Sequence, residues 1–219
     1  GYIWLSNTTL PSKRPVANSK IIMEKEEQIT RFLEKNGSFD KDDLKDFLLK
    51  RKSLFVRKGD TIVKEGQRCR SIYFIHSGVI SLFLLKNGEE HVKDFSLSGK
   101  FITAYTSMST GEPSQIFLRA EQDCELSVWD ASFFQELIKQ KQQWSLFALK
   151  IAENLFYRKE KREISMLLYT AEERYQNMLS EFPLLAQQVP QYLLASYVGI
   201  KPQSLSRIRN ILSQRSKLT

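Results

Sequence analysis

The sequence predicts an α+β protein, in which an antiparallel β-barrel or sandwich is followed by a long helix and a small helical module. Three observations predict this fold. Between residues 54 and 101, short β-branched and aromatic runs alternate with turn signals about ten residues apart. After Asp130 the apolar period changes from two to about 3.5 residues. After Pro190 two short helical patterns are separated by a glycine.

The predicted strand region contains five turn signals. Asn87-Gly88 is typical of a two-residue hairpin turn, because both central residues must tolerate positive φ. We expect strands to resume at residues 115–120 and 125–129. Regularly spaced turns of this kind predict an antiparallel barrel or sandwich. The five signals are Gly59-Asp60, Glu65-Gly66, Ser77-Gly78, Asn87-Gly88 and Ser98-Gly99.

Two short helices are expected before the strands. From Glu24 to Lys52 apolar residues recur at helical spacing, and Asn36-Gly37-Ser38 separates the two patterns. Residues 1–23 are a polar lead-in that contains prolines. Met23 is a candidate natural start, so we expect the residues before it to be an upstream or artificial extension.

The helix expected after the strands runs for about 25 residues, as far as about Leu168. A helix of this length serves more than a small barrel, so it either lies along the barrel or pairs with a copy of itself. We expect pairing in a homodimer, with Phe147 and Phe156 widening the apolar stripe enough to serve barrel and partner together. The predicted dimerisation residues are Trp144, Ala148, Ile151 and Leu155, and the same stripe continues with Arg158 and Arg162.

A second helical unit is expected to begin at Thr170. In Thr170-Ala171-Glu172-Glu173 the Thr hydroxyl can accept from the Glu173 amide, while the Glu173 side chain reaches back to the Thr170 amide. This capping box predicts a domain boundary at Tyr169-Thr170. The expected parts are the lead-in of residues 1–23, a β-domain with the long helix at residues 24–169, and a helical module at residues 170–219.

The charge distribution favours a polyanionic partner. The chain has 33 Lys and Arg against 25 Asp and Glu, a net charge of +8. Residues 182–219 contain no acidic residue, so their basic side chains attract nucleic acid or an anionic membrane, with nucleic acid favoured. A merely solvated basic surface is the alternative. The five cations are Lys201, Arg207, Arg209, Arg215 and Lys217.

The acid-free segment contains a helix-turn-helix pattern. A helix at residues 191–197, a turn at Val198-Gly199-Ile200 and a helix from Pro202 to Leu212 match the arrangement whose second helix enters the DNA major groove. An ordinary helical hairpin with a basic rim is the alternative. Apolar side chains can lock the two helices together, namely Leu194, Ala195, Val198, Ile200, Leu205 and Ile208.

The remaining side chains of the second helix are candidates for DNA contact. Arg207 and Gln203, one helical turn apart, are expected on base edges, because Arg and Gln pair bidentately with guanine and adenine. Lys201, Ser204 and Arg209 are expected mainly on phosphates. The full predicted DNA-binding set is Lys201, Gln203, Ser204, Ser206, Arg207 and Arg209.

Other functional classes find little support in the sequence. No clustered carboxylates, nucleophile–His pair or Gly-rich phosphate loop indicates an enzyme. Cys69 and Cys124 are too few for a disulfide scaffold or a Cys-rich metal site, and they suit a reducing cytosol. His76 and His91 both lie in strand patterns, and we expect no metal or other cofactor. No apolar run reaches the ~18 residues of a membrane-spanning helix, so we expect a cytoplasmic protein.

The chain resembles the CRP/FNR family of bacterial transcription regulators over nearly all of residues 24–219. The segments KGDTIVKEGQRCRSIYFIHSGVISLF and YLLASYVGIKPQSLSRIRNIL carry this resemblance, together with the long helix between them. The segments SMSTGEPSQIFLRAEQDCEL, TAEERYQNML and VPQYLLASYVGIKPQSLSRIR are similar to the branch found in Bacteroidetes.

The resemblance implies a cyclic-nucleotide-binding-like β-roll (a jelly roll), a homodimer formed along the long helix, and two recognition helices in successive major grooves. The implied function is sequence-specific regulation of transcription. The implied partners are double-stranded DNA with a palindromic operator, RNA polymerase, and a small-molecule effector of unknown identity. From the family's architecture, the candidate effector pocket comprises Phe83, Phe101, Tyr105 and Lys159.

The resemblance fails at the cyclic-nucleotide cassette. Members that bind cyclic nucleotides have a Gly-Glu pair shortly after the GxFI segment, and an Arg-Ser or Arg-Thr pair before the RA dipeptide. Here GKFI is followed by Thr103-Ala104, while Ser114-Gln115 occupies the second position. Gly111-Glu112 is interpreted as a loop tip. Because a buried phosphate without Arg is an unpaired charge, we expect an effector other than cyclic AMP.

A signalling or scaffold module remains as an alternative function. It would bind a small molecule or a protein through the β-roll, and its C-terminal helices would only dock. The acid-free tail and the helix-turn-helix pattern favour the DNA-binding regulator.

Overall fold

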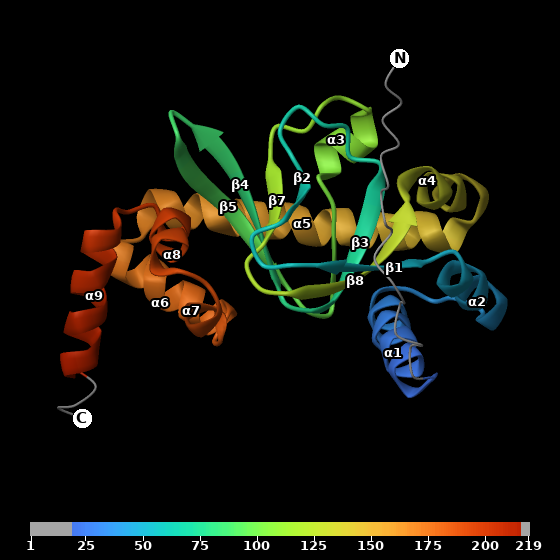
Figure 1. Cartoon of the computed structure of the whole chain (residues 1–219), viewed down its shortest axis with the longest axis horizontal. Coiled ribbons are helices and arrows are strands. Elements are labelled where there is room, and N and C mark those ends of the chain that lie inside the picture. Colours follow the sequence, from blue (N-terminus) through green and yellow to red (C-terminus); the bar gives the residue numbers. More distant parts are fainter. Residues whose placement is uncertain (1–18, 216–219) are drawn as a thin grey trace, which may run out of the picture.

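A computed structural model of the protein describes residues 19–215, which form two four-stranded sheets and helices at both ends (Figure 1). The helices are α1 (Ser19–Asn36), α2 (Lys41–Leu49), α3 (Tyr105–Thr110), α4 (Ala131–Gln140), α5 (Gln142–Leu168), α6 (Ala171–Glu181), α7 (Leu185–Gln188), α8 (Gln191–Val198) and α9 (Pro202–Arg215). The strands are β1 (Lys52–Val56), β2 (Thr61–Val63), β3 (Ser71–Ser77), β4 (Val79–Lys86), β5 (Glu89–Leu97), β6 (Lys100–Ile102), β7 (Phe117–Ala120) and β8 (Cys124–Asp130).

The strands form a β-roll of two antiparallel sheets, in the orders β1-β8-β3-β6 and β2-β7-β4-β5. Side chains alternate between the faces, as the two-residue period of a strand requires. On β3, Tyr73 and Ile75 belong to the core between the sheets, whereas Phe74 packs on the helical side. The predicted α+β class with an antiparallel roll is therefore confirmed.

The hairpin between β4 and β5 turns at Asn87-Gly88, as predicted. Asn87 has φ 54° and Gly88 has φ 79°, so both central residues lie in the left-handed region. This turn matches the right-handed twist of the flanking strands.

Three apolar cores hold the chain together. The first fills the roll and includes Ile75, Ile80 and Leu118. The second lies on the outer face of the β1-β8-β3-β6 sheet, where α1, α2, α4 and α5 cover Phe74 and Trp129. The third lies on the outer face of the β2-β7-β4-β5 sheet, which is covered by α6, α7, α8 and α9. Both sheets are thus apolar on two faces.

Helix α5 runs along the roll from the α1–α2 end to the α6–α9 end (Figure 1). It ends at Leu168, as the sequence predicted. Trp144 is 0 % exposed within its own chain and packs against Phe47 at 4.7 Å between ring centroids. The prediction that Trp144 forms the dimer contact is therefore wrong. Ala148, Ile151 and Leu155 are half-buried, and Ile151 packs against the same core.

The predicted boundaries correspond only in part to helix ends. Helix α1 begins at Ser19, so it crosses the boundary expected at Met23. Residues 1–18 of the predicted lead-in and residues 216–219 lie outside the described residues. The capping box at Thr170 is present: the Thr170 hydroxyl accepts from the Glu173 amide at 3.3 Å, and the Glu173 carboxylate accepts from the Thr170 amide at 2.8 Å. No helix within residues 19–215 is long and apolar enough to cross a membrane.

His76 is a buried, neutral histidine. It is 6 % exposed, its Nδ1 pairs with Gln28 Oε1 at 2.8 Å, and its Nε2 pairs with Ser127 Oγ at 2.8 Å. Because an amide oxygen only accepts, Nδ1 carries the proton and Nε2 accepts from the hydroxyl. Burial, followed by the nearby charge of Lys25, lowers the pKa of His76 to about 4.

We predict that His76 makes the fold acid-sensitive. Its unfolded pKa is about 6.5, so the unfolded chain binds more protons below that pH, and stability is lost as pH falls from about 6.5 to about 4. His76→Gln should reduce the total change in unfolding free energy across this pH window, by up to about 3 kcal/mol. Urea unfolding at several pH values measures it.

The exposed His91 supplies the matched control. His91→Gln should leave the wild-type slope in place. Equal slopes for wild type and His76→Gln would contradict the assignment.

Candidate nucleic-acid interface

Helices α8 and α9 form a helix-turn-helix unit around Gly199. Gly199 ends α8 with φ 79°, and the Ile200 amide donates to the Ala195 carbonyl oxygen at 3.0 Å. An added Cβ at Gly199 would lie 2.6 Å from Cε of Met166 on α5. The turn therefore needs glycine for its backbone conformation, whereas the end of the flexible Met166 side chain can move aside.

The inner face of α9 locks the unit together. Leu205 is fully buried, and Ile208 and Leu212 are partly buried against the same core. Leu194, Ala195 and Val198 of α8 belong to this core as well. The apolar residues that the sequence assigned to the helix contact lie where they were expected.

All six predicted DNA-contact residues are exposed, and two of them lie on the outer face of α9. An α-helix turns about 100° per residue, so Gln203 and Arg207 lie on the side opposite Leu205. Asn210 and Gln214 share this side and are also exposed. Sequence reasoning missed these two, although their spacing from Gln203, at i+7 and i+11, is the signal that could have found them.

Arg209 lies on a flank of α9 rather than on its outermost line. Its Nη1 donates to Gln191 Oε1 at 3.3 Å, which places its guanidinium beside the start of α8. A cation at this edge can reach a phosphate next to the groove. Arg215, near the end of the described residues, pairs with Glu172 at 2.5 Å.

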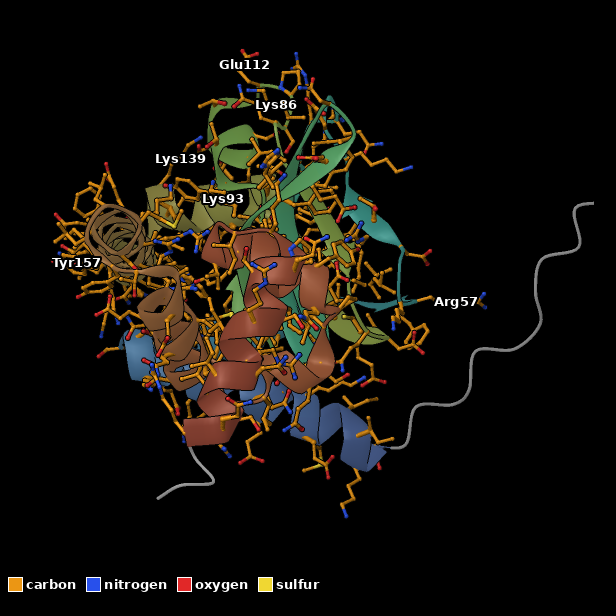
Figure 2. The ribbon with its side chains drawn as sticks, turned by 90° about the vertical axis from the view of Figure 1, so that its left-hand side faces the viewer. Arg57, Lys86, Lys93, Glu112, Lys139 and Tyr157 are labelled. Carbon is orange, nitrogen blue, oxygen red and sulfur yellow. The ribbon has the colours of Figure 1, made fainter. Side chains whose placement is uncertain are left out.

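Helix α5 carries a face, rich in apolar side chains but also containing Glu153 and Glu160, that the rest of the described chain leaves exposed. Leu149 and Phe156 are one heptad apart on this face, and Phe156 is 62 % exposed. Tyr157, next to Phe156, points away from the rest of the molecule (Figure 2). We call this the α5 outer face, and its exposed apolar residues are Leu146, Leu149, Phe156, Tyr157, Ile164 and Leu167.

The four residues of the candidate effector pocket are not brought together. Phe83 lies in the core beneath α6–α9 and stacks on Phe117 at 4.9 Å between centroids. Phe101 packs instead in the aromatic core beside α1 and α5. Tyr105 and Lys159 are exposed, on α3 and α5. The prediction of one pocket lined by these residues is therefore wrong, because the two aromatic rings face opposite outer sides of the roll.

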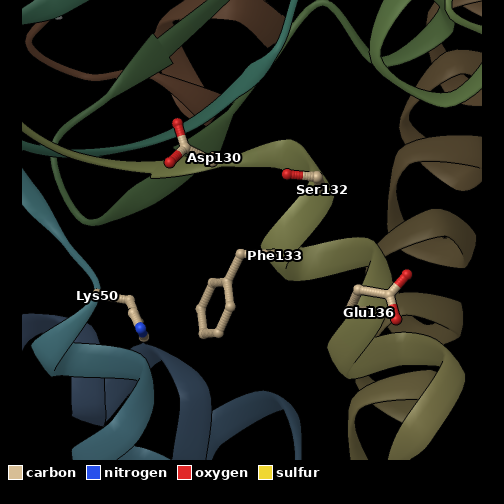
Figure 3. A pocket seen from close by; sticks show the side chains of 5 residues that line it. All are labelled: Lys50, Asp130, Ser132, Phe133 and Glu136. Atoms are coloured by element: carbon tan, nitrogen blue, oxygen red, sulfur yellow. The ribbon is translucent and has the colours of Figure 1, made fainter.

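A shallow pocket lies elsewhere, between the end of α2 and α4 (Figure 3). Lys50 and Phe133 point toward each other across it. Its walls carry both signs of charge, since Lys50 is joined by Asp130 and Glu136. It includes none of the residues predicted for an effector.

We compared the sequence and the fold with those of known proteins. Residues 53–141 match the family model of the cyclic nucleotide-binding domain. FixK2 from Bradyrhizobium japonicum is similar in structure, with a TM-score of 0.67 and 18 % identity over 76 % of this chain and 86 % of that chain. The chain has the CRP/FNR fold.

Two further solved structures are similar over most of the chain. The c-di-GMP-responsive global regulator CLP of Xanthomonas campestris has a TM-score of 0.64 and 15 % identity over 81 % of this chain and 93 % of that chain. A protein from Eubacterium rectale assigned to the CRP/FNR family of transcriptional regulators has a TM-score of 0.59 and 14 % identity over 81 % and 85 %. No curated protein matches the chain in sequence.

The residues at the positions of the cyclic-nucleotide cassette make contacts within the chain. Thr103 Oγ1 donates to the Ser71 carbonyl oxygen at 2.9 Å, and Ala104 is buried in the core of the roll. Ser114 Oγ donates to the Ile116 carbonyl oxygen at 2.8 Å. Gly111 ends α3, and Glu112 lies at the outer end of the loop that follows (Figure 2).

The matched domain contains four arginines, and only Arg119 is not exposed. Arg119 is already paired with carboxylates of the same domain. Its guanidinium binds Glu90 bidentately and donates from Nε to Glu121 at 3.0 Å. The hydrogen bonds to Glu90 raise the pKa of Arg119. Two carboxylates thus neutralise the cation, and the donor set does not fit a cyclic phosphate.

Proposed function

We propose that the protein is a homodimeric, cytoplasmic, sequence-specific DNA-binding transcription regulator of the CRP/FNR type. The observation that carries this proposal is the division of α9 into two faces. Leu205 and its neighbours anchor α9 in the core, while Gln203 and Arg207 are presented together to solvent. A basic helix held in this way fits the major groove, because its outward side chains are free to reach base edges.

Within the operator, the side chains of α9 have different roles. Arg207 and Gln203 contact base edges, and Lys201, Ser204, Ser206 and Arg209 contribute mainly at the backbone. Asn210 and Gln214 continue the row of outward side chains formed by Gln203 and Arg207 toward the end of α9. Contacts to the DNA backbone add affinity for every sequence, whereas contacts to base edges discriminate between sequences.

The dimer forms through the α5 outer face rather than through the stripe that includes Trp144. Six exposed apolar residues on one helix are a large surface to leave in water. A copy of α5 packed in parallel would cover them as a coiled coil, with Leu149 and Phe156 at equivalent heptad positions. Residues 24–169 then supply the roll and the dimer contact, and residues 170–219 supply the DNA-binding unit.

A two-fold dimer places two copies of α9 on half-sites about 34 Å apart, so the operator is palindromic. RNA polymerase is the expected protein partner of such a regulator. The roll interior is filled by its own side chains, and Arg119 is neutralised by Glu90 and Glu121. The effector is accordingly a small molecule other than cyclic AMP.

We predict that charge on the α5 outer face abolishes the dimer. The double variant Leu149→Asp, Phe156→Asp should be monomeric in light scattering, because two carboxylates at each seam cannot be desolvated against their copies. Phe55→Asp is the matched control, since Phe55 is 58 % exposed on β1. Persistence of the dimer in the double variant would show that another surface is used.

We predict that cyclic AMP and cyclic GMP bind weakly or not at all. Calorimetry on the wild-type protein should give no saturable heat at micromolar nucleotide, because no unpaired cation meets the phosphate. A dissociation constant near 1 μM, about −8 kcal/mol, would reveal a phosphate site and refute the prediction.

We predict that Arg207 and Arg209 differ in kind. Arg207→Ala should cost about 1–3 kcal/mol on the operator and relax the preference at one base pair per half-site. Arg209→Ala should weaken binding to all sequences alike and flatten the salt dependence. Titrations on operator and random duplexes at several salt concentrations separate the two effects. Equal losses for Arg207→Ala on both duplexes would reduce Arg207 to a phosphate contact.

A further inference from the structure

The DNA-binding unit is joined to the roll by more than the chain connection at Tyr169. Its apolar core is continuous with the outer face of the β2-β7-β4-β5 sheet. Phe95 of β5 packs on Tyr197 of α8 at 5.5 Å between ring centroids. The buried residues from both sides are Val79, Phe83, Val92 and Phe95 of the sheet, and Tyr175, Met178, Phe182, Leu193, Leu194 and Tyr197 of the helices.

Strand β5 is an edge strand, and α8 occupies its free edge. Ser196 Oγ accepts a hydrogen bond from the Val92 amide at 2.8 Å and donates one to the Glu90 carbonyl oxygen at 2.8 Å. One hydroxyl thus satisfies a donor and an acceptor that a neighbouring strand would otherwise satisfy. These two hydrogen bonds fix the position of α8 along β5, because they join Ser196 to the backbone of Glu90 and Val92 only.

Helix α5 meets the same point of the edge. Arg162 Nη2 donates to the Tyr197 carbonyl oxygen at 2.8 Å and to the Val92 carbonyl oxygen at 3.4 Å, while its guanidinium lies 4.0 Å from the centre of the Tyr197 ring. One turn earlier, Arg158 donates to Asp94 Oδ1 at 3.0 Å. We call the meeting of α5, β5 and α8 the edge junction, defined by Glu90, Val92, Arg162, Ser196 and Tyr197.

The edge junction also fixes the surroundings of α9, which packs on α8. Leu205 ties α9 to α8, so the two helices move as one body. The shared apolar core attaches this body to the sheet without directional contacts, and the edge junction adds hydrogen bonds at fixed positions along β5. An added base pair moves the second half-site by about 3.4 Å along the DNA axis and turns it by about 34° around that axis, so α9 must shift and rotate by these amounts to match a neighbouring operator spacing.

We propose that Ser196 is a positioning residue: by fixing α8 on the edge of β5, it sets the distance between the two recognition helices and hence the half-site spacing that the dimer accepts. This inference rests on the proposed function. Ser196 touches no base in this role. It acts through the placement of Gln203 and Arg207, so its loss changes tolerance of spacing and leaves base preference alone.

The test uses the intact dimer and a duplex that the wild-type protein selects from random-sequence DNA. Derivatives with one or two base pairs inserted or removed between the half-sites are then titrated. Wild type should bind the selected spacing at least about tenfold more tightly than its neighbours, and Ser196→Ala should reduce this ratio to about threefold or less. The cost of a base change within one half-site should be the same for both proteins.

A matched control and a direct structural readout accompany the titration. Ser180 is exposed on α6, and Ser180→Ala should keep the wild-type spacing preference. Amide exchange by NMR should show Val92 protected in wild type and exchanging about tenfold faster in Ser196→Ala, with the β3 amides unchanged. Unchanged β3 protection separates a loosened junction from a partly unfolded protein.

The outcomes distinguish this inference from the proposed function. A wild-type protein that selects no sequence overturns both. Selection of an operator, with the same spacing ratio in wild type and Ser196→Ala, overturns the positioning role alone. Unchanged exchange at Val92 overturns it as well, because the hydroxyl would then not hold the edge.

Discussion

The arrangement of the whole chain depends on the apolar outer face of the β2-β7-β4-β5 sheet. Phe83, Val92 and Phe95 are almost completely buried there, and the helices that bury them are those of the C-terminal unit. Apolar burial contributes about 25 cal/mol per Å², so a sheet face of this kind is covered in the native state. Helix α9 is therefore held by the roll, through α8, as well as by the chain connection at Tyr169, and the roll and the C-terminal helices share one core.

The opposite sheet imposes a matching constraint at the other end of α5. Phe74 and Trp129 point outward into a cluster of aromatic rings that also contains Trp144 and Phe147. This cluster fixes the first half of α5 to its own roll and leaves the α5 outer face exposed. The roll interior is filled at the same time by the inward residues of both sheets. Arg119, the one arginine of the matched domain that is not exposed, is paired with Glu90 and Glu121.

Local signals predicted much of the fold and of the site. Asn87-Gly88, the Thr170 capping box and the Gly199 turn are each decided by backbone geometry within a few residues, and all three occur as expected. The assignments that failed are of another kind. Trp144 was predicted to form a dimer contact and Phe83 to line a pocket, but each belongs to an apolar core of its own protomer. An apolar period shows that a side chain is covered, and it carries no information about what covers it.

The sequence alone therefore determined which segments are strands and helices, where they turn, and that α9 presents Gln203 and Arg207 opposite Leu205, because each of these depends on neighbours within about two helical turns. The tertiary structure decided which face of α5 is left exposed, how Arg119 is neutralised, and that Ser196 meets the edge of β5. These contacts join residues far apart in the chain, such as Ser196 with Val92 and Arg119 with Glu90. Their formation depends on how three cores pack at once, which no local pattern of residues specifies.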